Sequence, residues 1–468
     1  MDGTPAASGA APAVVPLRAN REFRLLWVGQ ALSDFGTAMT SLVLPLVLLR
    51  SGYSTSATSV IGTAVLVTAM VLRMPAGYLT DHYSHRRLML VADLARLVTV
   101  GAVAVWTYLD RLPIAMAVIT VVVAQVGVEL FRPSQNATVR RVVPAVQLGT
   151  AISLNQARAY AAGIVAPAVA GLLIAASLWL PFAIDAATYA VSALCVLALY
   201  RPLRRAEAAR RADRDARAGA GEGAAGTGET TPGGADPARD AADSEEAVLA
   251  HMSGAGATSE PRERFLPRLT AGLRYVVRNP FLRTVAGLAA GENFAFQALA
   301  YALLLGIGRE HDGAAAVGLA MSAAAITGLT GSLIAPFLQR RLRMQTVMAS
   351  GPALAGVMLA VAWYTDSGIA FAAGYSALCL LTPVNGAVFG TILATTVPEN
   401  IYGRTTTALG FVAEILQPLG PLAAGLLLSY LSLSGTAALF ALAFALLAAL
   451  ALLMPSPPVT ADAKTAAA

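Results

Sequence analysis

The sequence has little charge for its length. Asp, Glu, Lys and Arg together make up 13% of the 468 residues, whereas hydrophobic residues make up 56%. A water-soluble chain of this size cannot hide so much apolar surface in one core. A bilayer interior about 30 Å thick is spanned by an apolar helix of roughly 20 residues, and the sequence has many such runs. The composition therefore predicts an all-α integral membrane protein.

Cysteine is also scarce: Cys195 and Cys379 are the only two, and both lie inside apolar runs. Two isolated thiols form neither a disulfide framework nor the paired CxxC spacing of a zinc site. The HExxH pattern is absent, and so is the GxxxxGK[ST] phosphate loop of ATPases. We expect no metal, no cofactor and no enzymatic activity, and no ATP-driven transport by this chain.

What is present is a series of twelve apolar segments, each long enough to span a bilayer. They form two groups of six, separated by a long polar gap. The predicted spans are 24–49, 55–79, 87–108, 113–135, 148–176 and 179–200, followed by 281–307, 313–338, 344–364, 368–394, 404–431 and 433–454.

Arginine carries nearly all the positive charge, since Lys464 is the only lysine. Arginines cluster before the first span and after the second, fourth, sixth, eighth and tenth. The opposite loops contain only Arg50, Arg111 and Arg309. By the positive-inside rule, both termini are predicted to be cytoplasmic in a multi-pass cell-membrane protein. The net charge of +6 then belongs to cytoplasmic loops, and no nucleic-acid partner is expected.

The gap between the two groups is rich in Ala, Gly, Arg, Asp and Glu. Such a composition cannot bury apolar area and predicts a disordered linker. The segment after it has apolar residues at helical spacing between arginines, which is typical of an interfacial helix. The predicted organisation is a disordered N-terminal tail (1–19), a six-helix half (20–201), the cytoplasmic linker (202–264), the interfacial helix (265–280), a second six-helix half (281–454) and a disordered C-terminal tail (455–468).

The two halves repeat each other in sequence. A shift of 254 residues places Gly77 on Gly331 and carries several further residues of the first half onto matching ones. At the start of each half the shift is 258 residues, and it pairs Asp34 with Glu292. Two six-helix halves in the same orientation are parallel pseudo-repeats. In transporters, such repeats place the substrate site near the bilayer midplane between them.

The stretch "GYLTDHYSHRR" at 77–87 resembles the loop motif between helices 2 and 3 of the major facilitator superfamily. Phrases such as "ELFRPSQNATVRRVVP" and "LRYVVRNPFLR" resemble the branch that includes the enterobactin exporter and macrolide efflux proteins. The resemblance covers nearly the whole chain and implies a transporter. It also implies a conformational switch in which Gly77 lets helices 2 and 11 approach, while Asp81 and Arg86 pair. His82, Ser84 and His85 depart from the motif.

Charged residues inside the membrane are functional candidates by default. Asp34 and Glu292 each lie about ten residues, or roughly 15 Å, into their helices, which is near the midplane. In the superfamily that the chain resembles, these two helices line the central cavity, so both acids are expected to face it. Removal from water favours the neutral form of a carboxyl group, which suits proton loading and unloading. Either acid could instead attract a cationic substrate, or be held structurally by a neighbouring helix.

Several other charges are weaker candidates for proton coupling or substrate binding. Arg158 is either a counter-charge to a cavity acid or a site for an anionic group. Glu129 and Arg132 are three residues apart, share a helix face and could pair. Glu414 is a cavity candidate, whereas Asp185 is expected to be structural.

The stretch "GIVAPAVAG" at 163–171 resembles the antiporter motif of helix 5, although Ala166 and Ala170 replace glycines. Proline bends a helix, and glycine lets helices touch. The family reads this motif as a mark of exporters, and a shorter copy recurs in the eleventh span. The motif residues are Gly163, Pro167 and Gly171, with Gly420, Pro421 and Gly425 in the copy.

The sequence therefore predicts a secondary active transporter. We expect a proton-coupled exporter of a small amphipathic molecule, such as a drug, antibiotic or siderophore, acting by alternating access as a monomer. The partners are the substrate, protons and the bilayer. An uncoupled lipid or lysolipid mover and a transporter-like membrane sensor stay open as alternatives, and an importer is a third.

Overall fold

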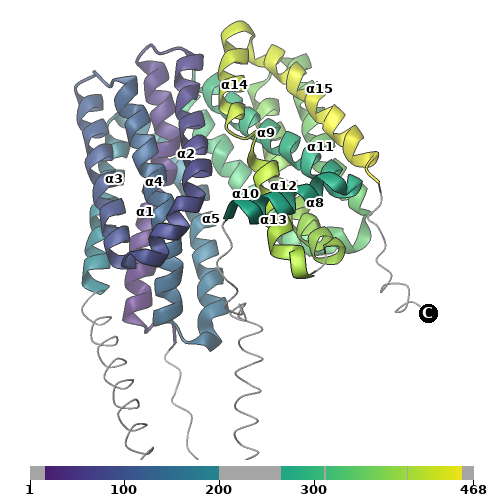
Figure 1. The fold of residues 1–468 in the computed structure, drawn as a ribbon. Coiled ribbons are helices and arrows are strands. Elements are labelled where there is room, and N and C mark those ends of the chain that lie inside the picture. The colour runs from purple at the N-terminus through teal and green to yellow at the C-terminus, as the bar shows by residue number, and fades with distance from the viewer. Residues whose placement is uncertain (1–15, 200–264, 310–312, 398, 456–468) are drawn as a thin grey trace, which may run out of the picture.

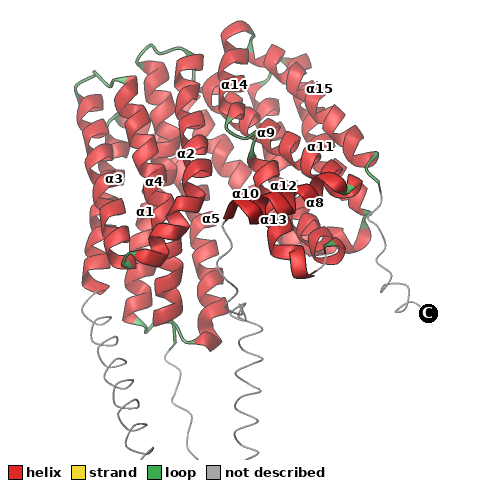
Figure 2. Cartoon of the chain, viewed as in Figure 1, coloured by secondary structure: helices red, strands yellow, loops and turns green. Residues whose placement is uncertain are grey.

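The computed structural model describes residues 16–199, 265–309, 313–397 and 399–455. Throughout these ranges the regular structure is helical and no strand occurs, as Figure 2 shows. Twelve of the helical segments are long and apolar enough to cross a membrane, which confirms the predicted fold class. The predicted linker and most of both predicted tails lie outside the described residues.

The helices follow the predicted spans closely, apart from the eleventh span. The first half contains α1 (Arg21–Arg50), α2 (Thr55–His82), α3 (His85–Tyr108), α4 (Ile114–Val142), α5 (Ala145–Ala176) and a sixth span at Leu180–Leu199. The second half contains α8 (Phe265–Arg278), α9 (Pro280–Gly308), α10 (Gly313–Arg341), α11 (Met344–Thr365), α12 (Gly368–Thr396), α13 (Glu399–Glu414), α14 (Leu419–Tyr430) and α15 (Leu433–Leu452).

The repeat is visible in local structure as well as in sequence. Asn20 and Asn279 cap the first membrane-spanning helix of each half, α1 and α9, and each side chain accepts hydrogen bonds from two backbone N–H groups. Asp110 and Asp366 follow the third and ninth spans, and both adopt φ 51°. Aspartate tolerates this left-handed conformation better than most residues. Equivalent caps and turns therefore fix equivalent helix ends in both halves.

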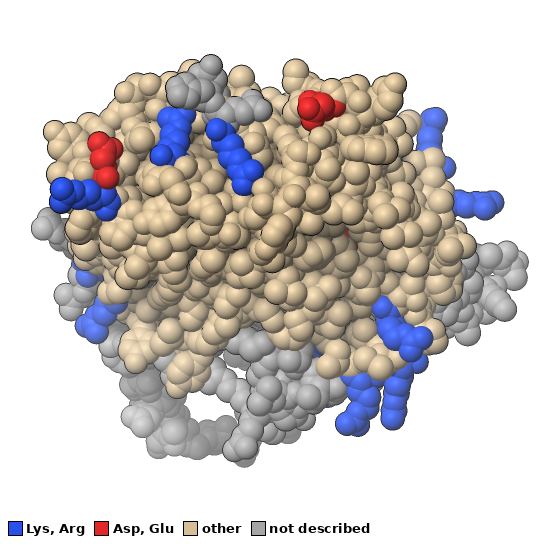
Figure 3. Space-filling model, turned by 90° about the horizontal axis from the view of Figure 1, so that it is seen from above, with Lys and Arg blue, Asp and Glu red and all other residues tan. Residues whose placement is uncertain are grey.

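The two halves meet at one end of the molecule. In Figure 1 their ribbons lie close together where α14 turns into α15 and diverge toward the end where α8 and α13 lie. The main contacts between halves pair α5 with α10 and α2 with α14. The largest cluster of buried apolar residues spans the junction and includes Leu46 of α1, Ala170 of α5 and Leu303 of α9. Figure 3 looks onto the closed end, where charged side chains are sparse and scattered.

Glycines of the predicted helix motif allow the closest of these contacts. A Cβ added to Gly171 would lie 3.0 Å from Ala315 Cα, and one added to Gly425 would lie 2.7 Å from Thr55 O. The hydroxyl of Thr55 bonds to Gly425 O at 3.1 Å. Arg309 Nη2 donates to the same hydroxyl at 2.7 Å and to Leu428 O at 3.0 Å. Backbone approach and hydrogen bonds together hold this end shut.

Replacing Gly425 with Val is expected to open this end, because the new side chain meets the Thr55 backbone and the Ser59 side chain. We would measure maleimide labelling of Thr55→Cys, a position that is 2% exposed, in detergent, after replacing both native cysteines. Labelling should become several-fold faster. The matched control is Gly410→Val, since a Cβ there has no neighbour within 4 Å. Equal labelling rates in the two variants would contradict the assigned contact.

The eleventh span departs from the sequence expectation, which was one continuous helix over 404–431. It is broken into α13, which ends at Glu414, and α14, which begins at Leu419. Pro418 explains the break, because its ring clashes with the carbonyl four residues earlier and it lacks an N–H. Neighbouring helices bond to carbonyl groups beside the break: Asn293 Nδ2 donates to Ala413 O at 3.0 Å, and Thr63 Oγ1 to Pro418 O at 3.0 Å. Broken helices in transporters mark positions close to a binding site.

Candidate functional site

A central cavity of about 420 Å³ lies between the two halves. The first half contributes residues of α1, α2 and α5, including Gly163 and Pro167, and the second half contributes residues of α9, α10 and α12. The lining is mostly apolar, with Gln297, Tyr301 and Tyr375 among its polar and aromatic members. This volume lies within the range of small-molecule sites. Two aromatic residues of the same helices, Phe35 of α1 and Phe294 of α9, are not part of this lining.

Beside this cavity, Asp34 of α1 forms an ion pair with Arg158 of α5. Arg158 Nε lies 3.0 Å from Asp34 Oδ2, and the side chains are 8% and 26% exposed, respectively. Gln30 Nε2 donates to the other carboxylate oxygen at 2.8 Å. Asp34 precedes the cavity residue Ala38 by one helical turn. The sequence left open whether Arg158 is a counter-charge or binds an anionic group; here it pairs with Asp34, and its role in transport stays a prediction.

Glu292 of α9 lines a second cavity of about 180 Å³ that lies wholly within the second half. Its lining is more polar and includes Asn293, Asn385 and Gln417, the last from the break in the eleventh span. Oxygen Oε1 of Glu292 is buried and has no hydrogen-bond partner among the described residues. Gln297 lines both cavities and so connects them.

The expectation that both acids face one cavity differs from this arrangement. Neither Asp34 nor Glu292 lines the central cavity; Asp34 belongs to α1 in the first half, and Glu292 lines the cavity inside the second half. The repeat explains why the two acids differ. The 254-residue shift that relates the halves carries Arg158 onto Val412. Glu292 therefore lacks the equivalent of the arginine that Asp34 has.

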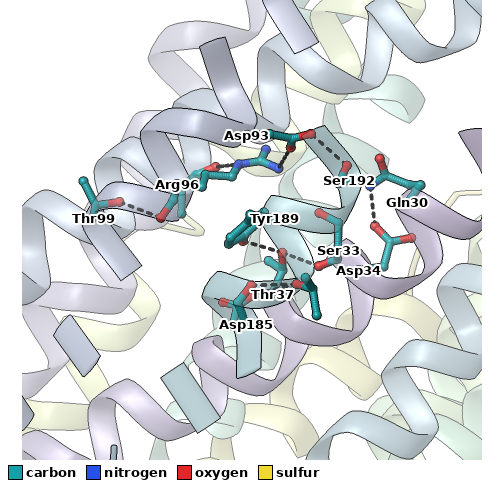
Figure 4. A network of polar contacts seen from close by, with 12 residues as sticks. Gln30, Ser33, Asp34, Thr37, Asp93, Arg96, Thr99, Asp185, Tyr189 and Ser192 are labelled. Carbon is teal, nitrogen blue, oxygen red and sulfur yellow. Dashed lines mark hydrogen bonds and ion pairs between the residues drawn. The ribbon is translucent and has the colours of Figure 1, made fainter. Parts of the chain in front are cut away.

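A third polar cluster lies inside the first half, among α1, α3 and the sixth span (Figure 4). Arg96 is 2% exposed and lies 3.8 Å from Asp93, which accepts from Ser192 Oγ at 2.7 Å. Its guanidinium also lies over the ring of Tyr189, 5.4 Å from the centroid. Asp185 is fully buried and accepts from Thr40 Oγ1 at 2.5 Å. These contacts link three helices, as expected of a structural role for Asp185.

The remaining charged candidates, Glu129, Arg132 and Glu414, do not line the central cavity or the Glu292 cavity. Glu129 accepts a hydrogen bond from Gln125 Nε2 at 2.9 Å, and no ion pair joins it to Arg132 in the described part of the chain. Arg132 is exposed. Glu414 is the last residue of α13, beside the break in the eleventh span. Each of their functional roles stays a prediction.

The predicted switch residues fall partly outside what the structure describes. Gly77 and Asp81 lie in the last turns of α2, but their side chains are outside the described residues. Arg86 lies in the first turn of α3. The halves meet at the end of α2 that begins with Thr55. The three switch residues lie at the other end of α2 and at the start of α3. Their pairing stays a prediction.

The six residues of the predicted antiporter motif lie at contacts or at the cavity. Gly163 and Pro167 line the central cavity. Gly171 and Gly425 lie at the contacts between halves, and Gly420 lies against α9, where a Cβ would be 2.8 Å from Ala298 N. Pro421 is buried in α14 beside it. The sequence motif therefore marks close packing, and its link to export stays a prediction.

Sequence reasoning did not single out Thr40, Tyr189 or Gln417 as members of these sites. Thr40 and Tyr189 look like ordinary residues of membrane helices, since nothing local indicates that they face buried charges. For Gln417 a signal was present, because it directly precedes Pro418 inside an apolar span. Proline in a span is where freed backbone groups and nearby polar residues gather.

Comparison with known proteins gives a consistent result. The family model for the Major Facilitator Superfamily matches residues 26–415. The multidrug efflux pump Tap of Mycolicibacterium fortuitum is 23% identical over 440 residues, which are 90% of this chain and 92% of that protein. Macrolide efflux protein A of Streptococcus pyogenes is 26% identical over 158 residues, which are 34% of this chain and 38% of that protein.

Solved structures agree on the fold. A bacterial homologue of the iron transporter ferroportin, in an inward-facing state, has a TM-score of 0.63 at 13% identity and covers 93% of this chain and 97% of that one. A D-xylose–proton symporter has a TM-score of 0.59 at 14% identity, and the match covers 93% of this chain and 98% of that one. At these identities the likeness concerns the fold alone.

Proposed function

This chain belongs to the major facilitator superfamily, and from that premise we propose that it is a proton-coupled exporter of small amphipathic molecules. Members of the family are multi-pass membrane transporters and not enzymes. The single observation that carries the proposal is the ion pair between Asp34 and Arg158, which joins two candidate membrane spans beside the central cavity.

An ion pair in this position is suited to coupling because proton binding changes its charge. With Asp34 ionised, the attraction to Arg158 offsets the cost of holding both groups away from water. A proton on Asp34 removes one charge and leaves Arg158 without its partner. The two protonation states then favour different arrangements of α1 and α5. A ligand shifts a conformational equilibrium only through such a difference between states.

The cargo is proposed from the central cavity and from the relatives. The cavity is mostly apolar and holds two tyrosines with a few polar groups, which suits a molecule with an apolar body and polar substituents. The relatives that cover most or part of the chain are described as multidrug and macrolide efflux proteins. We therefore propose that transport runs outward and that the cargo is a drug-like or antibiotic-like molecule.

The transport cycle follows from the arrangement of the halves. Contacts hold the halves together at the Thr55 end. We therefore propose that the central cavity opens toward the opposite end, which the arginine distribution predicts to be cytoplasmic. Cargo enters there, and rocking of the halves then exposes it on the other side. Asp34 and Glu292 are the proposed proton-binding groups. Asp81 and Arg86 are proposed to pair in the other state of the cycle, in which the cavity faces the opposite side of the membrane.

The proposal predicts energy-dependent efflux. In cells that overproduce the protein, some compounds of a panel of macrolides, tetracyclines and lipophilic amines should accumulate less than in control cells. An uncoupler should remove the difference, because it collapses the proton gradient without affecting protein level. Efflux that survives the uncoupler would instead support uncoupled movement of lipid-like molecules.

A further inference from the structure

A side cavity of about 120 Å³ lies inside the first half, next to the central cavity. Residues of α1, α2, α3, α4 and the sixth span line it, and the second half contributes Tyr301 of α9. We propose that this side cavity binds one apolar ring of the cargo, and that Tyr301 determines how large this group is. The inference rests on the proposed export function, which it extends from a class of cargo to a chemical group.

The side cavity adjoins the central cavity, because three residues line both: Ser41 of α1, Val65 of α2 and Tyr301. A molecule in the central cavity therefore lies within reach of the side cavity. The central cavity, at about 420 Å³, holds the body of a small drug-like molecule. The side cavity is too small for such a body, but it is close in size to the cavity of about 150 Å³ that binds benzene in a protein core.

The chemistry of the side cavity favours an apolar occupant. Thr37 Oγ1 lies 2.8 Å from the Tyr189 hydroxyl, as Figure 4 shows. Gln125 Nε2 donates to Glu129, and Thr40 donates to a buried carboxylate. These polar groups have partners within the protein, and most of the other lining side chains are aliphatic. A polar group placed here would lose its water without gaining a partner, whereas an apolar group gains from leaving water.

Tyr301 forms part of the wall between the two cavities. Its ring packs on the backbone of Gly62 in α2, where any added Cβ would overlap the phenol. The two partners of this contact belong to different halves, so the ring closes the side cavity from outside the first half. A smaller side chain at this position would join the two cavities. Tyr301 is therefore the specificity-determining residue for the group that enters.

The test measures binding of two matched probes to the purified full-length chain in detergent. Methyltriphenylphosphonium and benzyltriphenylphosphonium share a bulky core that is larger than the side cavity. They differ only in a methyl group against a single ring on a flexible carbon. The parent chain should bind the benzyl compound about tenfold more tightly, the gain expected from burying one ring. Comparing this ratio between variants removes the greater partition of the benzyl compound into detergent.

Filling the side cavity should abolish the preference for the benzyl compound. Ala124→Leu adds three carbon atoms to the lining from α4, so the two probes should bind equally. Ala115→Leu, at an exposed position of the same helix that lines neither cavity, is the control and should keep the tenfold ratio. The same ratio in both variants would overturn the proposal, and so would a parent chain that binds neither probe.

Shortening Tyr301 tests its role independently of Ala124. Tyr301→Ala joins the two cavities, so naphthylmethyltriphenylphosphonium, which carries two fused rings, should bind at least as tightly as the benzyl compound. Tyr301→Phe keeps the ring on Gly62 and should still favour benzyl over naphthylmethyl. If the two variants rank these probes in the same order, Tyr301 does not set the size of the group.

Uncoupler-sensitive efflux of the same probes from cells is measured separately. A benzyl preference that Ala124→Leu removes from binding, without any efflux by the parent chain, would refute the export function and leave the side cavity as a binding site. Efflux by a parent chain that shows no such preference would refute the side cavity and leave the export function.

Discussion

Replacing Asp34 with Asn is expected to abolish uncoupler-sensitive efflux while leaving membrane insertion intact. Asn keeps the size of the side chain and can still accept a hydrogen bond from Gln30. It carries no charge, however, and does not bind a proton at physiological pH. Arg158, 3.0 Å away, loses its partner in every step of the cycle. Efflux should fall to the level of cells without the protein, measured with any compound that the wild type exports.

The double variant Asp34→Asn/Arg158→Gln separates coupling from structure. If the pair only holds α1 against α5, neutralising both partners removes the unpaired charge, and both stability and efflux recover. If Asp34 carries the proton, thermal stability recovers but efflux does not. Glu22→Gln, an acid in the first turn of the same helix, is the control for loss of one carboxyl group. Recovered efflux in the double variant would contradict the coupling role of Asp34.

Replacing Glu292 with Gln is expected to have the second-largest effect. Glu292 faces a polar cavity with Asn385 and Gln417, and no arginine of the described residues lines that cavity. Val412 stands where the repeat would place the equivalent of Arg158. A carboxyl group in such a place binds either a proton or a cationic group of the cargo. Efflux of every compound should be lost if it binds a proton, whereas only cationic compounds should be affected if it binds cargo.

The measurement compares efflux of cationic and neutral compounds by Glu292→Gln. Glu22→Gln is the control, since Glu22 lies in the first turn of α1 and does not line the Glu292 cavity. Protein level and thermal unfolding are measured for both, so that a folding defect is recognised. Unchanged efflux of every compound by Glu292→Gln would contradict both proposed roles of this residue.

The fold was predictable because its signals are local and strong. Runs of apolar residues define the spans, and the repeat from Gly77 to Gly331 and from Asp34 to Glu292 indicates two similar halves. The break between Glu414 and Leu419 is different, because proline is tolerated in many membrane helices. Pro45, Pro75 and Pro167 lie inside unbroken helices of this chain. Only tertiary context shows that Pro418 ends one.

The sites were predictable in part. Intramembrane charge singled out Asp34, Arg158 and Glu292, because burial makes such residues costly. Which of them meet depends on the rotation of each helix about its axis, which the sequence does not specify. The repeat suggested that Asp34 and Glu292 are equivalent, but backbone symmetry does not extend to their partners. Because Arg158 has Val412 as its equivalent in the second half, Asp34 forms an ion pair, whereas Glu292 lies in a separate cavity.

The most direct test of the central claim is proton movement driven by cargo. The purified chain is reconstituted into liposomes that contain a pH indicator, and an exported compound is added to one side without a pre-formed gradient. Proton-coupled export predicts that cargo movement drives protons in the opposite direction, and that Asp34→Asn shows no such signal. Cargo movement without any change in pH would contradict the account.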